Sequence, residues 1–122
     1  MSRTVLIVDD NAIIRRMLRD SIEDNREWQV CGEAENGRIA VERVKELHPD
    51  IVILDLQMPD PDGFDLLKAE HSKFPYLRIL VISGYLHGAL LEAAELFGAI
   101  ATLEKPITAE ALVGKVREVL GR

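Results

Sequence analysis

Short apolar runs alternate along the chain with segments whose apolar residues recur every three or four positions. The apolar runs cover 4–8, 29–34, 51–54, 78–83 and 100–104. The segments with helical periodicity cover 11–24, 37–47, 63–74, 88–98 and 108–121. Short runs rich in Val, Ile and Leu indicate strands, and recurrence at three- and four-residue intervals indicates amphipathic helices. The pattern therefore predicts five strands and five helices in strict alternation.

Each helical segment carries a stripe of apolar residues that we expect to face a core. The first stripe is Ile14, Met17, Leu18 and Ile22. The second is Ala40, Val41, Val44 and Leu47. The third and fourth are Phe64, Leu67 and His71, then Leu90, Ala93, Ala94 and Phe97. The last is Leu112, Val116 and either Val119 or Leu120.

Strict alternation of strands and helices predicts a parallel sheet with helices on both faces, an α/β three-layer sandwich of the (βα)5 type. The runs at 5–8, 51–54 and 79–82 are apolar at every position, as central strands should be. The run at 29–34 alternates more, which suits an edge strand. We expect a doubly wound, flavodoxin-like sheet in the order 2-1-3-4-5.

Length and composition agree with one globular domain over residues 1–122, with 48% hydrophobic and 30% charged residues. The net charge of −6 argues against nucleic acid as a partner, because phosphates repel such a surface. The lone Cys31 excludes an internal disulfide, and we expect its small side chain to be buried. The first residues lack the apolar span of a signal peptide, so we expect a cytoplasmic protein.

Carboxylates follow two strands of the predicted sheet. Asp9 and Asp10 come directly after the first strand, and Asp55 comes directly after the third. In the predicted order these strands are neighbours beside the switch point, where open parallel sheets bind ligands. Carboxylates this close repel one another, and oxygen ligands suit a hard divalent cation. The sequence therefore predicts a Mg²⁺ site, although Asp10 or Asn11 could instead cap the following helix.

Two further polar side chains fall on the same edge of the predicted sheet. The fourth strand ends in Ser83, and the fifth is followed by Lys105 and Pro106, whose peptide bond could be cis. An ammonium group facing carboxylates can neutralise charge on a phosphoryl group. Together these groups offer a nucleophilic carboxylate, metal ligands, a hydroxyl and a cation. This set is typical of phosphoryl transfer to an aspartate.

With these motifs the chain resembles the receiver domain of two-component response regulators. The motifs are Asp9-Asp10, Asp55, MPDPDG at 58–63, Ser83 and Lys105-Pro106. The resemblance spans the whole chain and implies residue roles by position. Asp10 and Asp55 would bind Mg²⁺ directly with the carbonyl of Gln57, and Asp9 would hold the ion through water.

The resemblance also implies a signalling function. Asp55 would accept a phosphoryl group from a sensor histidine kinase or phosphotransfer protein, Lys105 would pair with it, and Ser83 would move to bind it. The helix at 11–24, with Arg15, Arg16 and Met17, would lie near the kinase, or its charges would form an ordinary solvated face. The signal would pass to a downstream protein or output domain that the sequence does not identify.

Three other functions were weighed. A phosphatase with an aspartate nucleophile needs a general acid two residues after it, where this chain has Gln57. A flavodoxin-like cofactor binder needs a phosphate-binding loop after the first strand, where Asp9 and Asp10 oppose anions. A degenerate receiver would serve only as an interaction module, but the acids, Ser83 and Lys105 are all present.

Two positions bear on the switch itself. Typical receivers have Tyr or Phe three residues before the lysine, whereas this chain has Thr102. A short β-branched side chain cannot turn inward as a ring does, so we expect activation to move residues 83–90 more than the fifth strand. Tyr85 lies two residues after Ser83, and we expect it to shield the acyl phosphate from water.

Overall fold

The computed structural model describes residues 3–55, 73–74, 77–84 and 99–121 of the 122-residue chain. The described strands are β1 (Arg3–Val8), β2 (Trp28–Ala34), β3 (Ile51–Asp55), β4 (Arg78–Ser83) and β5 (Ala99–Glu104). The described helices are α1 (Ala12–Glu23), α2 (Gly37–Leu47) and α5 (Ala109–Leu120). These bounds agree with the predicted ones to within one residue at each end. The helices expected over 63–74 and 88–98 lie outside the described residues, except for residues 73 and 74.

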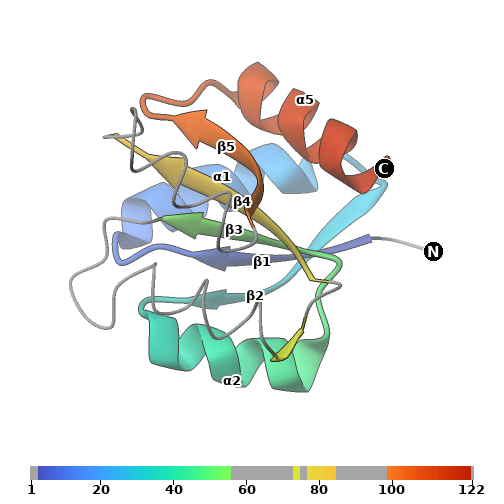
Figure 1. Cartoon of the computed structure of the whole chain (residues 1–122). Helices are drawn as coiled ribbons and strands as arrows, with labels where there is room; N and C mark the ends of the chain where they lie inside the picture. Colours follow the sequence, from blue (N-terminus) through green and yellow to red (C-terminus); the bar gives the residue numbers. More distant parts are fainter. Residues whose placement is uncertain (1–2, 56–72, 75–76, 85–98, 122) are drawn as a thin grey trace.

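The strands form one parallel sheet in the order β2-β1-β3-β4-β5, which confirms the predicted topology. β1, β3 and β4 are the central strands, and the more polar β2 lies at an edge, as expected. The arrows in Figure 1 show all the strands ending at the same side of the sheet. Register pairs Val8 with Leu54 and Ser83 with Glu104, so residues that follow these strands meet along one rim.

Helices cover both faces of the sheet, with α1 and α5 on one face and α2 on the other (Figure 1). Val5 and Ile7 of β1 pack into the core under α1 and α5, whereas Leu6 and Val8 pack into the core under α2. Successive side chains of a strand point to opposite faces, and both faces are covered. This is why the central strands are apolar at every position. Burial of each such Val, Leu or Ile contributes about 1.5–3 kcal/mol.

The predicted helix stripes are confirmed in α5 and partly wrong in α1 and α2. Val119, rather than Leu120, completes the buried stripe of α5. In α1 only Leu18 and Ile22 are buried, and Met17 is 56% exposed. Met17 lies at the side of this narrow stripe, above a groove between α1 and the start of α5. In α2 the last residue of the expected stripe, Leu47, is likewise exposed.

Cys31 is half-buried rather than buried. The register of β2 against β1 shifts at this point, from Val5 opposite Val30 to Leu6 opposite Gly32, so Cys31 is an extra residue without a partner in the pairing. Such a bulge interrupts the strand ladder and keeps the side chain from full burial. The Cys31 thiol donates a hydrogen bond to the carbonyl oxygen of Val5, at a distance of 3.5 Å.

None of the helices in the described part of the chain has the length and apolar composition needed to cross a membrane.

Candidate functional site

Three carboxylates meet at the ends of β1 and β3, as predicted. Asp9 and Asp10 follow β1, Asp55 is the last residue of β3, and the two strands are direct neighbours. An oxygen atom from each carboxylate lies within 4.8 Å of the others. Asp9 and Asp55 are 0% and 2% exposed, whereas Asp10 is exposed. The cluster therefore has a buried floor and an open side that a small ion can reach.

The turn that carries the first two acids is held by its own hydrogen bonds. The Asp9 amide donates to the carbonyl oxygen of Ala34 at 3.1 Å, which ties the turn to β2. One Asp9 carboxylate oxygen, Oδ1, accepts from the Asn11 amide at 2.9 Å. Asn11 caps α1, because its side-chain oxygen accepts from the amides of Ile13 and Ile14. Of the two candidates for the cap, Asn11 is therefore the one used, and Asp10 contributes its carboxylate to the cluster.

Lys105 supplies a positive charge to the cluster, as its position after β5 predicted. Its Nζ lies 3.3 Å from Oδ2 of Asp55 and 3.7 Å from Oδ2 of Asp9. The backbone amide of Lys105 donates to the carbonyl oxygen of Ser83 at 2.9 Å. Ser83 is fully buried at the end of β4. The Lys105–Pro106 bond is cis, as expected.

Charge and burial in the cluster favour a cation. Burial raises the pKa of Asp9, while the hydrogen bond from the Asn11 amide lowers it; Asp55 raises it, Lys105 lowers it, and Asp10 raises it. Oδ2 of Asp9 is buried and has no hydrogen-bond partner among the described residues. A single ammonium group thus faces three carboxylates. This donor set fits a hard divalent cation that prefers oxygen ligands, with Asp9, Asp10 and Asp55 as the groups that could hold it.

An ion-paired network beside the cluster was not anticipated from the sequence. Arg15 lies on α1, and its side chain is only 16% exposed. It binds Glu33 of β2 and the carbonyl oxygen of Asp9. Arg15 therefore faces the acid cluster rather than solvent, unlike the face proposed for a kinase. The signal was the spacing of Arg15 and Arg19, which places two cations on one side of α1, opposite an acid on the edge strand.

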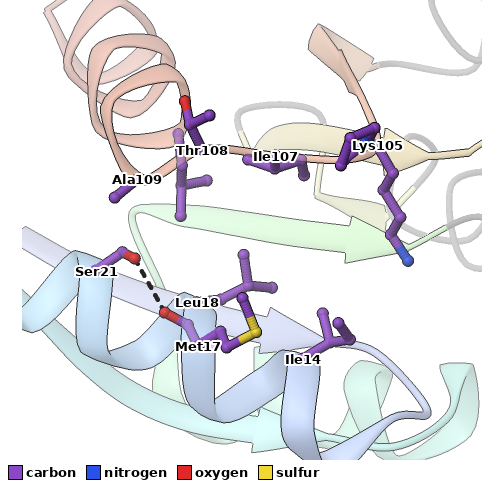
Figure 2. A pocket seen from close by; sticks show the side chains of 10 residues that line it. Ile14, Met17, Leu18, Ser21, Lys105, Ile107, Thr108 and Ala109 are labelled. Atoms are coloured by element: carbon purple, nitrogen blue, oxygen red, sulfur yellow. Dashed lines mark hydrogen bonds between the residues drawn. The ribbon is translucent and has the colours of Figure 1, made fainter.

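A groove opens beside the cluster, between α1 and the loop that leads from β5 to α5. Figure 2 shows side chains of α1 on one side and residues of this loop and the start of α5 on the other. The volume of the groove is about 570 Å³. Lys105 takes part in both features, because it lines the groove while its side chain extends toward the end of β3 (Figure 2). The groove lining is mostly apolar: Ile14, Met17, Leu18, Ser21, Lys105, Pro106, Ile107, Thr108, Ala109 and Leu112.

Other residues predicted to take part are not placed. Gln57 and Tyr85 lie outside the described residues, as do all the residues of the MPDPDG segment at 58–63. Thr102 is half-buried on β5, where it pairs in register with Val81. The described part of the site therefore consists of Asp9, Asp10, Asp55, Ser83 and Lys105.

Comparisons with known proteins agree with this arrangement. The chemotaxis protein CheY of Thermotoga maritima is 40% identical over 119 residues, which cover 98% of each chain. A protein-glutamate methylesterase/protein-glutamine glutaminase of Pyrococcus abyssi is 40% identical over 104 residues. That match covers 84% of this chain but only 28% of the methylesterase. The chain thus corresponds to about a quarter of that relative's length and to nearly all of CheY.

Solved structures show the same likeness. The response regulator domain of Thermotoga maritima CheB superimposes with a TM-score of 0.92 at 31% identity, covering 100% of this chain and 98% of that one. A family profile described as the response regulator receiver domain matches residues 5–117. The parallel sheet, the acid cluster with its lysine and the match over nearly the whole chain agree. The chain belongs to the response regulator receiver domain family.

Proposed function

We propose that this chain is a phosphorylation-controlled switch that accepts a phosphoryl group on Asp55. The observation that carries the proposal is the place of the Asp55 carboxylate. It is held at the end of a fully buried strand, 3.3 Å from an ammonium group and within reach of two further carboxylates. A buried strand holds the nucleophile in one position, and the ammonium offsets charge that the transfer adds to the site.

The transfer proposed is from a phosphohistidine of a sensor histidine kinase or phosphotransfer protein. A carboxylate oxygen of Asp55 attacks phosphorus, the phosphorus–nitrogen bond breaks, and an acyl phosphate forms while the imidazole keeps the bonding electrons and takes up a proton. Lys105 stands beside the acceptor oxygen and stabilises the negative charge of the phosphoryl oxygens. Ser83, at the end of the neighbouring strand, would then bind a phosphoryl oxygen and so report the modification.

Magnesium is part of the proposal. By position Asp10, Asp55 and the backbone carbonyl of Gln57 would hold the ion, and Asp9 would bind one of its waters. When bound, Mg²⁺ supplies positive charge that offsets the phosphoryl oxygens. The buried Asp9 Oδ2, which lacks a hydrogen-bond partner in the described part of the chain, supports a cation at this site.

The exposed side of α1 is the surface we propose for the phosphodonor. Ile13 and Met17 are 72% and 56% exposed, and both lie on the helix that begins just after the acid cluster. The groove beside them is shared with Lys105 and Ile107. Large exposed apolar side chains next to a reactive centre suit an apolar partner surface. Of the charges expected near the kinase, Arg16 is exposed and Arg15 is not.

The receiver family is a signalling family, and the proposal treats the chain as a switch rather than an enzyme with its own substrate. A phosphatase would turn over phosphate, and a degenerate receiver would not be modified at all. The downstream partner or output domain, the assignment of 1–122 as the whole domain and the cytoplasmic location stay predictions of the sequence.

The experiment is phosphorylation by acetyl phosphate, followed by intact-protein mass spectrometry with Mg²⁺ and with EDTA. We expect a single phosphoryl adduct on the wild type with Mg²⁺, and none with Asp55→Asn or with EDTA. Asp20→Asn is the matched control, because it removes one exposed carboxylate from α1 without touching the cluster. An adduct that persists in Asp55→Asn would exclude Asp55 as the sole acceptor. Release of many phosphates per protein would favour the phosphatase.

A further inference from the structure

Arg15 links the edge of the sheet to the backbone of the acid cluster. Its NH1 donates to the carbonyl oxygen of Asp9 at 2.6 Å, and its Nε donates to Oε1 of Glu33 at 3.0 Å. The other Glu33 oxygen, Oε2, accepts from Arg19 at 2.9 Å. The Arg15 and Glu33 side chains are 16% and 32% exposed. This is a continuous chain of contacts from α1 and β2 to the peptide between Asp9 and Asp10.

The carbonyl that Arg15 holds belongs to the peptide that joins the first two acids. Rotation of this peptide would change the directions of both side chains that flank it. The Asp9 amide and Oδ1 are already bound, to Ala34 and Asn11 respectively. The bond from Arg15 occupies the Asp9 carbonyl as well. Every polar atom of Asp9 except Oδ2 is thereby engaged away from the cluster, and Oδ2 is the buried oxygen that lacks a hydrogen-bond partner in the described part of the chain.

The charge of Glu33 matters for the same reason. A guanidinium next to a cation site repels the cation, and the repulsion is strong where water is excluded. Glu33 binds Arg15 directly and offsets its charge, so Arg15 can orient the turn with less repulsion of a bound ion. A planar guanidinium can bond two acceptors at once, which an ammonium group does with less directional precision.

We propose that Arg15, held by Glu33, is a positioning residue that orients the Asp9–Asp10 peptide and thereby raises the affinity of the cluster for a divalent cation. The inference rests on the metal site of the proposed function. It assigns Arg15 a role within the protein in place of a role in kinase binding. Groups that act on metal ligands from behind commonly change metal affinity by about 10- to 100-fold.

The test is the Mg²⁺ dissociation constant of the unphosphorylated protein, measured from NMR amide shifts during a Mg²⁺ titration. Arg15→Gln removes a positive charge near the site, so a purely electrostatic role predicts tighter Mg²⁺ binding. Positioning predicts the opposite sign, and we expect binding about tenfold weaker. Arg16→Gln is the matched control, because it makes the same change at the next, exposed residue; we expect its dissociation constant to be unchanged or slightly lower.

Two further variants separate positioning from a general loss of stability. Arg15→Lys keeps the charge but not the fork, and we expect weakening smaller than that of Arg15→Gln. Glu33→Gln should weaken binding in the wild-type background and have little effect when Arg15 is already Gln, because Glu33 acts through Arg15. If Arg15→Gln does not fold, Arg15→Lys and Glu33→Gln carry the test alone.

The possible outcomes are distinct. Weaker binding in the Arg15 variants, with Arg16→Gln near wild type, supports the proposal. Wild-type or tighter binding in both Arg15→Gln and Arg15→Lys overturns it. If Arg15→Gln does not fold, wild-type binding in both Arg15→Lys and Glu33→Gln overturns it. A wild-type protein that binds no Mg²⁺ overturns the metal site of the proposed function and this inference with it.

Discussion

The ammonium nitrogen of Lys105 lies 3.3 Å from Oδ2 of Asp55, although the two residues are 50 positions apart in the chain. The contact spans two strands, because β4 lies between the strand that ends in Asp55 and the strand that precedes Lys105. Only the long side chain of lysine reaches across this distance. The nucleophile and the group that neutralises its charge are therefore placed by the sheet order.

Lys105→Gln should have opposite effects on metal binding and on phosphoryl transfer. Removing the ammonium removes a cation that competes for Asp9 and Asp55, so we expect tighter Mg²⁺ binding. The phosphoryl oxygens lose their positive partner, so we expect phosphorylation by acetyl phosphate to slow at least about tenfold at saturating Mg²⁺. Stopped-flow rates and a Mg²⁺ titration measure the two effects separately.

Lys115→Gln is the control for this variant, since it makes the same change in charge on α5, where Lys115 pairs with Glu118. We expect it to leave both quantities unchanged. A Lys105 variant with wild-type rates would show that the observed ion pair has no part in the transfer.

Asp9→Asn should stabilise the protein when Mg²⁺ is absent. Asn keeps an oxygen that can accept from the Asn11 amide, and it removes a buried charge that Asp55 and Asp10 oppose. Because the pKa of Asp9 is raised by burial, ionisation of Asp9 costs stability as pH rises through that pKa. The gain in free energy of unfolding should therefore be near zero below the ordinary pKa of 3.8 and full at neutral pH.

Chemical denaturation in EDTA at several pH values measures this gain. Addition of Mg²⁺ should stabilise the wild type more than the variant, because the variant has lost one ligand charge. A gain that is largest at acid pH would contradict the sign of the pKa shift.

Met17→Ala should weaken transfer from a histidine kinase without affecting acetyl phosphate. Met17 is exposed beside the groove and does not contact the acid cluster, so the change removes partner contact and leaves the chemistry intact. We expect the KM for the phosphorylated kinase to rise about tenfold, the effect of losing about 1.4 kcal/mol of interface energy. Leu47→Ala is the control, an exposed apolar residue on the opposite face of the sheet. Equal effects from both variants would exclude α1 as the docking surface.

Activation should move residues 83–90 more than β5. Thr102 is the residue on β5 where typical receivers carry a ring, and its short side chain has little to turn. Ser83 and Gly84 are described, whereas residues 85–90 lie outside the described residues, so this stays a prediction from the sequence. Hydrogen exchange with and without beryllofluoride measures it. Largest changes over residues 100–104, with 83–90 unchanged, would contradict this account of the switch.

The alternation of apolar runs and amphipathic segments was enough to predict the sheet, its order and its edge strand. Central strands covered on both faces must be apolar throughout, and that requirement is visible in the sequence itself. The carboxylates and the lysine were predictable for the same reason. Residues that follow parallel strands must meet at one rim, and Asp9, Asp55 and Lys105 each stand at the end of a strand.

What only the tertiary structure decided is which polar side chains face one another. Asn11 and Asp10 were equal candidates for the helix cap, and the geometry of the turn selected Asn11. Arg15 was interpreted as a surface charge because helical periodicity does not tell whether an acid lies opposite. Glu33 comes from the edge strand, and its contact with Arg15 exists only once α1 has packed beside β2. Met17 was placed in the core because its spacing suits the stripe. The groove between α1 and α5 leaves it exposed, since the spacing of two helices is set by packing and not by either helix alone.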